Sequence, residues 1–279
     1  MYNLPYTNKQ INIPYLLKIG NGKIYKIGKY LKDKNLPGVA LFLGDGTEEL
    51  VGAELRRGFG DNDINVVHSQ VVSDISIESI TQTAFQLPPA TDVVVGIGGG
   101  KALDFAKYSA HLLRLPFVSV PTSTSNDGFC SPTSSLTVGG RRKTVKSSIP
   151  FGVVIDLDVI RSCPPVFFYS GLGDMVSKIT ALADWKEAAN RKLERYSDFA
   201  SMLAYNSLDL LFIKHSFDIN APEFQRSLTT SLLMSGISME VAGTSRPASG
   251  SEHLVSHALD EVCARPQMHG LQVGTAAYL

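Results

Sequence analysis

The stretch TDVVVGIGGGKALDFAK (residues 91–107) decides the fold, because a buried apolar strand runs into a glycine run and then into a helical pattern. Neither common phosphate-loop pattern fits: GxGxxG would need a third glycine at Lys101, and GxxxxGK followed by Ser or Thr fails at Ala102. Glycines before a helix still let the backbone approach an anion closely, and the helix dipole favours negative charge there. We therefore expect Gly98, Gly99 and Gly100 to bind phosphate, with an ordinary tight turn as the alternative.

The first half of the chain alternates short apolar runs with helical patterns, which predicts a parallel sheet covered by helices on both faces. Lys101 begins one helix, and a hairpin over 134–148 turns at Gly139-Gly140. Strands are expected at 38–44, 64–71, 91–98, 116–122 and 151–160, and further helices at 47–59 and 76–87.

The pattern changes after residues 163–168. Long amphipathic stretches at 174–196 and 224–243 follow, with no convincing strand. We place a boundary at the proline pair 164–165, which predicts an α/β domain over 1–164 and an all-helical domain over 165–279.

Composition limits the classes of partner and of compartment. The 279 residues carry 26 basic and 26 acidic side chains, which argues against nucleic acid or an acidic membrane surface as the main partner. We identify no apolar run of about 18 residues and no signal peptide, so no membrane insertion is expected. Cys130, Cys163 and Cys263 are odd in number and lack CxxC spacing, which favours free thiols in a cytoplasmic protein.

Two further segments carry polar chemistry. PTSTSNDGFCSP (121–132) follows a strand and offers many hydrogen bonds to a polar ligand, or is simply a polar loop turning at Asn126-Asp127-Gly128. In SGSEHLVSHALD (249–260), His253 and His257 stand four residues apart and share one helix face. With His269 and with Asp174 at an expected helix start, they suit zinc or a similar divalent ion. The alternatives are two polar residues on a helix face and a helix cap at Asp174.

Five segments in order resemble the sn-glycerol-1-phosphate dehydrogenases, which lie within the iron-containing alcohol dehydrogenase, glycerol dehydrogenase and dehydroquinate synthase-like superfamily. The resemblance runs from about residue 15 to the last residue. It implies an N-terminal dinucleotide-binding domain, a C-terminal helical domain and an active site in the cleft between them. The segments are GGGKALDFAK, PTSTSNDGFCSP, GLGDMVSKITALADW, GSEHLVSHALD and HGLQVG.

The resemblance also implies roles for individual residues. His257 and Asp127 would face the substrate, with His257 as a proton relay, and Asp174 would lie at the substrate as well as at the metal. The implied metal ligands are Asp174, His253 and His269. The implied cofactor-binding residues are Gly98, Gly99, Gly100, Lys101 and Ala102 for the pyrophosphate, and Thr122, Ser123, Thr124, Ser125 and Ser131 for the remaining nucleotide.

The implied reaction, a step of phospholipid biosynthesis, is reversible hydride transfer between NAD(P)H and dihydroxyacetone phosphate, giving sn-glycerol 1-phosphate. Zinc, or Fe²⁺ or another divalent ion, would polarise the carbonyl. The substrate phosphate needs a cation, and Lys146 is favoured over Arg141, Arg142 and Lys143. A solvated hairpin tip is the favoured reading of Arg141 and Arg142. Asp45, after a strand, weakly favours NAD over NADP.

Two departures from the family pattern bear on activity. Leu271 stands where the family often has glutamate in HGEQVG, and relatives continue well beyond the third metal ligand, whereas this chain stops at Leu279. We therefore expect an incomplete C-terminal domain: a fragment, a truncated product or a domain completed by another chain, with a homo-oligomer expected. The rival functions are a dehydrogenase for an unphosphorylated polyol such as glycerol, a dehydroquinate synthase-like cyclase, and an inactive nucleotide-binding remnant.

Overall fold

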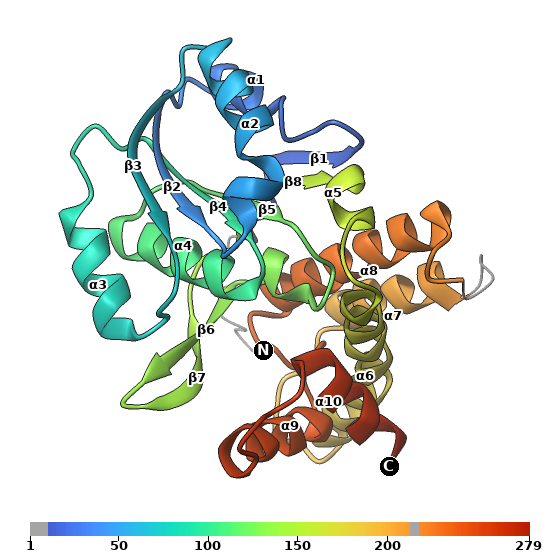
Figure 1. The fold of residues 1–279 in the computed structure, drawn as a ribbon. Helices are drawn as coiled ribbons and strands as arrows, with labels where there is room; N and C mark the ends of the chain where they lie inside the picture. The colour runs from blue at the N-terminus through green and yellow to red at the C-terminus, as the bar shows by residue number, and fades with distance from the viewer. Residues whose placement is uncertain (1–10, 213–217) are drawn as a thin grey trace, which may run out of the picture.

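The computed structural model describes residues 11–212 and 218–279. Its main element is a six-stranded, wholly parallel sheet in the order β1-β8-β5-β4-β2-β3 (Figure 1). This arrangement confirms the predicted α/β class. The strands are β1 (Leu16–Gly20), β2 (Gly38–Leu43), β3 (Asn65–Val71), β4 (Val93–Gly98), β5 (Phe117–Pro121) and β8 (Gly152–Asp156).

Helices cover both faces of this sheet because the central strands are apolar on both sides. All six residues of β2 are buried; Val39, Leu41 and Leu43 pack toward one face, and Ala40 and Phe42 toward the other. The first face is covered by α1 (Ile27–Lys32) and α2 (Thr47–Gly60), and the second by α3 (Ile77–Gln86) and α4 (Gly100–Leu113).

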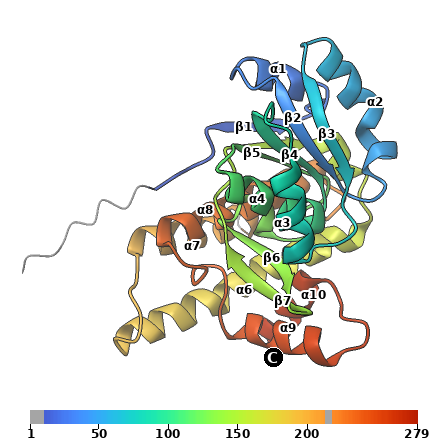
Figure 2. The same ribbon diagram turned by 90° about the vertical axis from the view of Figure 1, so that its left-hand side faces the viewer.

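The predicted hairpin is present as β6 (Thr133–Val138) and β7 (Arg141–Lys146), with Gly139 and Gly140 at positive φ in the turn. It follows a short 3₁₀ turn, η1 (Asp127–Cys130). Figure 2 shows the hairpin extending away from the sheet toward the last two helices of the chain.

The second half of the described chain is helical, as the sequence predicts. Its helices gather on one side of the sheet domain (Figure 1). They are α6 (Pro165–Asn190), α7 (Asp198–Phe212), α8 (Pro222–Ala242), α9 (Ser251–Val262) and α10 (His269–Tyr278). None of the described helices is long and apolar enough to cross a membrane.

Two predicted boundaries are wrong. The strand expected over 151–160 ends at Asp156, whose side chain accepts a hydrogen bond from Asp158 N at 3.0 Å and so starts the short helix α5 (Leu157–Arg161). The helix expected from Asp174 begins at Pro165 instead, which places Asp174 in the middle of α6 rather than at a helix start.

The reason for the second error is that the glycines of GLGD are packing positions, not helix breakers. A Cβ on Gly171 would lie 1.9 Å from Thr124 O, and one on Gly173 would lie 2.3 Å from Gly270 O. Both glycines therefore allow α6 to approach the backbone of other segments closely.

The division into two domains at 164–165 stays a prediction. The helix α6 does begin at that point, but one apolar cluster crosses it and joins Val153 and Ile155 of β8 to Phe168, Leu228 and Leu232 of the helical half. The two halves therefore share buried surface next to the site described below.

Candidate functional site

The glycine run lies where neighbouring parallel strands send the chain in opposite directions. After β2 the chain moves outward to β3, and after β4, on the other side of β2, it moves to β5. Open α/β sheets bind ligands at such a switch point, beyond the carboxyl ends of the strands.

The geometry of the run suits an anion. Gly98 has φ +145°, and a Cβ there would lie 2.9 Å from Gly44 N, so glycine is required for the turn. A Cβ on Gly99 or Gly100 would meet nothing within 4 Å, and Gly100 begins α4. Thr122 N donates to Gly98 O at 3.1 Å, which places the loop 122–125 beside the run.

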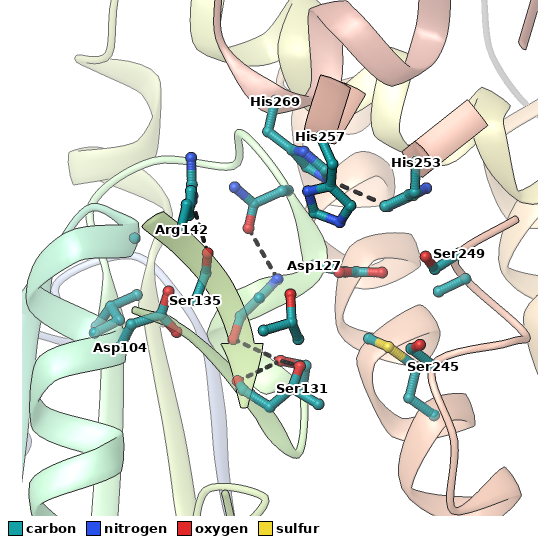
Figure 3. A pocket seen from close by; sticks show the side chains of 18 of the residues that line it. Asp104, Asp127, Ser131, Ser135, Arg142, Ser245, Ser249, His253, His257 and His269 are labelled. Atoms are coloured by element: carbon teal, nitrogen blue, oxygen red, sulfur yellow. Dashed lines mark hydrogen bonds between the residues drawn. The ribbon is translucent and has the colours of Figure 1, made fainter. Parts of the chain in front are cut away.

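A cavity of about 250 Å³ opens between the two halves of the molecule. Figure 3 shows His253, His257 and His269 reaching into it from the helical half, opposite Asp104, Ser131 and Ser135. Of the residues singled out from the sequence, it is lined by Gly100, Lys101, Asp127, Ser131, Arg142, His253, His257 and His269.

Other predicted residues do not line this cavity. Asp174 is buried, 1% exposed, and does not itself line the cavity. Lys146 lines a different cavity of about 1020 Å³, which shares Thr133, Thr144 and Ser245 with the first. The rest that do not line it are Gly98, Gly99, Ala102, Thr122, Ser123, Thr124 and Ser125, which lie in the glycine run, at the start of α4 and in the adjacent loop.

Asp174, His253 and His269 come together from α6, α9 and α10. One ligand atom from each lies within 4.8 Å of the other two, and the two Nε2 atoms are 3.2 Å apart. Burial lowers the pKa of His269 to about 3, and the neighbouring His253 and the ammonium of Lys178 act in the same direction. His269 is therefore neutral near pH 7, which is the state in which an imidazole binds a metal ion.

The hydrogen bonds around the two imidazoles decide which nitrogen carries the proton. His253 Nδ1 lies 2.8 Å from Glu252 Oε1, and a carboxylate only accepts. His269 Nδ1 lies 3.3 Å from the Ser256 hydroxyl, which itself donates to Gln272 Oε1 at 2.6 Å and so accepts from the ring. With Nδ1 as the donor of each neutral ring, both Nε2 lone pairs are available to a divalent cation beside the carboxylate, which would replace the hydrogen bond that joins the two Nε2 atoms at 3.2 Å.

Lys178 forms ion pairs with two carboxylates of the site, Asp174 and Asp127. Its ammonium lies 3.0 Å from Asp174 Oδ1 and 3.1 Å from Asp127 Oδ2, and it is fully buried. Burial opposes its charge, but the two carboxylates outweigh burial and raise the pKa of Lys178. Sequence reasoning missed Lys178, although its position four residues after Asp174 was a usable signal.

Asp127 is held in place from three sides. Its backbone N–H donates to Asp174 Oδ2 at 3.0 Å, and its own Oδ2 accepts from the Ser235 hydroxyl at 2.7 Å and pairs with Lys178. The carboxylate is therefore oriented by α6 and α8 while lining the cavity.

Lys107, at the end of the opening stretch, was also missed. It is 1% exposed, and its ammonium donates to Gly128 O at 2.7 Å and to Thr133 O at 2.6 Å. Burial lowers the pKa of Lys107 and raises that of Asp104, which lies 3.4 Å away and lines the cavity. Lys107 thus ties the helix that follows the glycine run to the loop that carries Asp127.

Arg142 is the hairpin cation that lines the cavity. Its Nε donates to the Ser135 hydroxyl at 2.7 Å, and its Nη1 lies 3.7 Å from Asp260 Oδ2 on α9. Arg142 is exposed near the hairpin tip, as the solvated-tip reading predicts, but its side chain also bridges the hairpin and the helical half. Close by, burial lowers the pKa of His257, and the charge of His253 lowers it further.

Comparison with known proteins gives concordant results. Residues 18–164 match the family described as iron-containing alcohol dehydrogenase. A glycerol-1-phosphate dehydrogenase (NAD(P)+) of Metallosphaera sedula is 36% identical, over 96% of this chain and 77% of that protein. The protein of the same name from Methanothermobacter thermautotrophicus is 35% identical, over 97% of this chain and 78% of that one.

Solved structures agree at the level of the fold. Glycerol dehydrogenase of Schizosaccharomyces pombe superposes with a TM-score of 0.81 at 22% identity, covering 97% of this chain and 71% of that one. An iron-containing alcohol dehydrogenase of Thermotoga maritima gives a TM-score of 0.71 at 17% identity, covering 95% and 76%.

Proposed function

The chain belongs to the iron-containing alcohol dehydrogenase family and, within it, to the glycerol-1-phosphate dehydrogenases; from this premise we propose that it interconverts dihydroxyacetone phosphate and sn-glycerol 1-phosphate with NAD(P). It is an oxidoreductase acting on a CH–OH group. The observation that carries the proposal is the meeting of Asp174 with His253 and His269, whose imidazoles line a cavity that also reaches the start of α4.

The glycine run and the adjacent loop are the proposed cofactor site. Support comes from the open backbone at Gly99 and Gly100, which start α4, and from the hydrogen bond that joins Thr122 to Gly98. The nicotinamide supplies the hydride when it is bound, and the protein supplies its orientation. The proposed pyrophosphate residues are Gly98 to Ala102, and the remaining nucleotide would lie against Thr122 to Ser125 and Ser131.

Asp45 bears on the choice between the two cofactors. It is exposed directly beyond the end of β2, next to the switch point. A carboxylate there would repel a 2′-phosphate, so we propose a preference for NAD over NADP.

Asp174, His253 and His269 are the proposed metal ligands, and zinc is the proposed ion. Two imidazole nitrogens and one carboxylate oxygen form a donor set that zinc accepts, with room left for substrate. When bound, such an ion supplies Lewis-acid polarisation of the substrate carbonyl. Lys178 pairs with both Asp174 and Asp127 and offsets one of their two negative charges.

The proton and the phosphate are assigned to other residues of the cavity. His257 lines it with a lowered pKa, so its imidazole is neutral near pH 7 and able to accept a proton. Asp127 is oriented by Ser235 and would face the substrate. Arg142, rather than Lys146, is the proposed phosphate cation, because Arg142 lines this cavity and Lys146 lines the other.

Compartment and assembly are proposed on separate grounds. The three cysteines are free, which fits the reducing cytoplasm. Leu254 and Tyr278, on the neighbouring helices α9 and α10, are 70% and 90% exposed, which supports association of identical subunits.

The test is oxidation of NADH and of NADPH by the zinc-loaded protein with dihydroxyacetone phosphate. We expect turnover that is lost in His253→Ala and kept in His111→Ala, whose ring lies outside the metal cluster. Faster turnover of dihydroxyacetone than of its phosphate would instead indicate a polyol dehydrogenase. No turnover of either substrate by folded, zinc-bearing protein would indicate an inactive nucleotide-binding protein.

A further inference from the structure

Glu252 is a buried carboxylate next to a proposed metal ligand. It is 2% exposed, and three neighbouring residues donate hydrogen bonds to it. Its Oε1 accepts from Gly250 N at 2.7 Å and from His253 Nδ1 at 2.8 Å, and its Oε2 accepts from the Thr180 hydroxyl at 2.8 Å. Because Thr180 belongs to α6, Glu252 ties the start of α9 to the helix that carries Asp174.

Ser256 holds the second imidazole in the same way. Its hydroxyl is fully buried, donates to Gln272 Oε1 at 2.6 Å and accepts from His269 Nδ1 at 3.3 Å. The amide of Gln272 is oriented in turn, because its Nε2 donates to Asp260 Oδ1 at 3.2 Å. In this series from Asp260 through Gln272 and Ser256 to His269, the direction of each hydrogen bond follows from the one before it.

We propose that Glu252 and Ser256 are positioning residues that keep the protons of His253 and His269 on Nδ1, so that both Nε2 lone pairs point at one divalent cation. The proposal rests on the proposed function. Without these partners either ring could carry its proton on Nε2, and that proton would occupy the 3.2 Å gap between the rings.

The roles of Glu252 and Ser256 bear on Leu271, where the chain departs from the family pattern. At this position the family often has a glutamate, whose carboxylate this chain lacks. In the structure the polar side chain that supports His269 through Ser256 is Gln272, which is buried, whereas Leu271 is only half-buried. Glu252 supplies a buried carboxylate to the ligand set, through His253.

The test measures metal binding rather than turnover. The zinc dissociation constant is determined for the full chain by competition with a chromophoric chelator, for Glu252→Ala, Ser256→Ala and Glu252→Gln. We expect about 10- to 100-fold weaker binding in the two alanine variants, as for other partners of metal-binding histidines. Glu252→Gln keeps an acceptor for Nδ1 and should lose less. Glu261→Ala, on the exposed end of the same helix, is the matched control and should bind like the parent.

A second readout reports the proton directly. ¹⁵N spectra of the imidazoles in zinc-bound protein should show protonated Nδ1 and metal-bound Nε2 on both rings, and Glu252→Ala should move His253 toward the other tautomer. If Glu252→Ala does not fold, Ser256→Ala, which deletes one oxygen, still tests the proposal for His269. A loss of zinc affinity below fivefold in the variants that fold would overturn the proposal. Failure of the parent protein to bind zinc would instead remove the proposed function.

Discussion

Buried charges with defined partners organise the site at the scale of single residues. Lys178 bridges Asp127 and Asp174, and Lys107 holds the carbonyls of Gly128 and Thr133. A buried ion costs several kcal/mol of desolvation unless its partners compensate, so removing one partner is much more costly than removing a surface charge.

Lys178→Met should therefore destabilise the metal-free protein. The change leaves two carboxylates buried without a cation, and the expected loss is about 3–5 kcal/mol in the free energy of unfolding, measured by urea denaturation in the presence of EDTA. Lys186→Met, at an exposed position of the same helix, is the control and should change it by less than about 0.5 kcal/mol. Equal stability of the two variants would contradict a stabilising role for the ion pairs of Lys178 with Asp127 and Asp174.

Arg142→Met should raise the KM for dihydroxyacetone phosphate by about 10- to 100-fold, the range expected for a lost charged hydrogen bond of about 1.5–3 kcal/mol. The KM for unphosphorylated dihydroxyacetone should change little. Lys146→Met is the matched control, because Lys146 lines the neighbouring cavity. A larger effect at Lys146 than at Arg142 would restore the choice made from the sequence.

The residues that spacing and resemblance could not identify are those whose role depends on burial. His253 and His269 are conspicuous as imidazoles, and Asp174 stands in a recognisable segment. Glu252, by contrast, is one of 26 acidic side chains, and only the fold shows that it is buried against a histidine. Arg142 was judged solvated because the contact with Asp260 spans 118 residues of sequence.

At the scale of elements, the glycines of the run have two different roles: Gly98 is needed for the backbone conformation, and Gly99 for the approach of a ligand. Gly98→Ala forces a Cβ to 2.9 Å from Gly44 N at φ +145° and should cost about 1–3 kcal/mol of stability. Gly99→Ala meets nothing within 4 Å, so its melting temperature should stay close to the parent's while its affinity for NADH falls. Calorimetry and NADH titration of both variants distinguish the two effects. Unchanged NADH affinity in Gly99→Ala would argue against a phosphate at that glycine.

The sequence predicts the type of an element where its hydrophobic pattern extends over many residues. The predicted boundaries are wrong where tertiary contacts decide where an element begins or ends. The central strands β2 and β4 are wholly apolar and were expected to within two residues. The start of α6 was missed by nine residues because Gly171 and Gly173 stand inside a helix that needs their small size to approach Thr124 and Gly270. Short elements such as β1 and α1 have too few residues for a clear period.

At the scale of the whole molecule, Cys130 reports whether the two halves stay docked. It is fully buried and packs against Gly236 of α8, while burial raises the pKa of its thiol to about 12. At pH 8 only about one thiol in ten thousand would then be ionised. Iodoacetamide followed by mass spectrometry should label the exposed Cys263 well before Cys130. Equal labelling rates in native protein would contradict this packing.

The helix α9 packs against the rest of the molecule with few buried side chains. Among its twelve residues, all of them described, only Glu252 and Ser256 are buried, whereas α8 buries eleven. It is therefore anchored by polar contacts more than by apolar packing, and it should open as a local unit well below the free energy of global unfolding. A bound ion would raise that opening energy, since it bridges α9 to α6 and α10. The rate of hydrogen exchange at the α9 amides would then report the fraction of molecules that hold an ion. The exchange rate at the α8 amides should not depend on the ion and would serve as the internal reference.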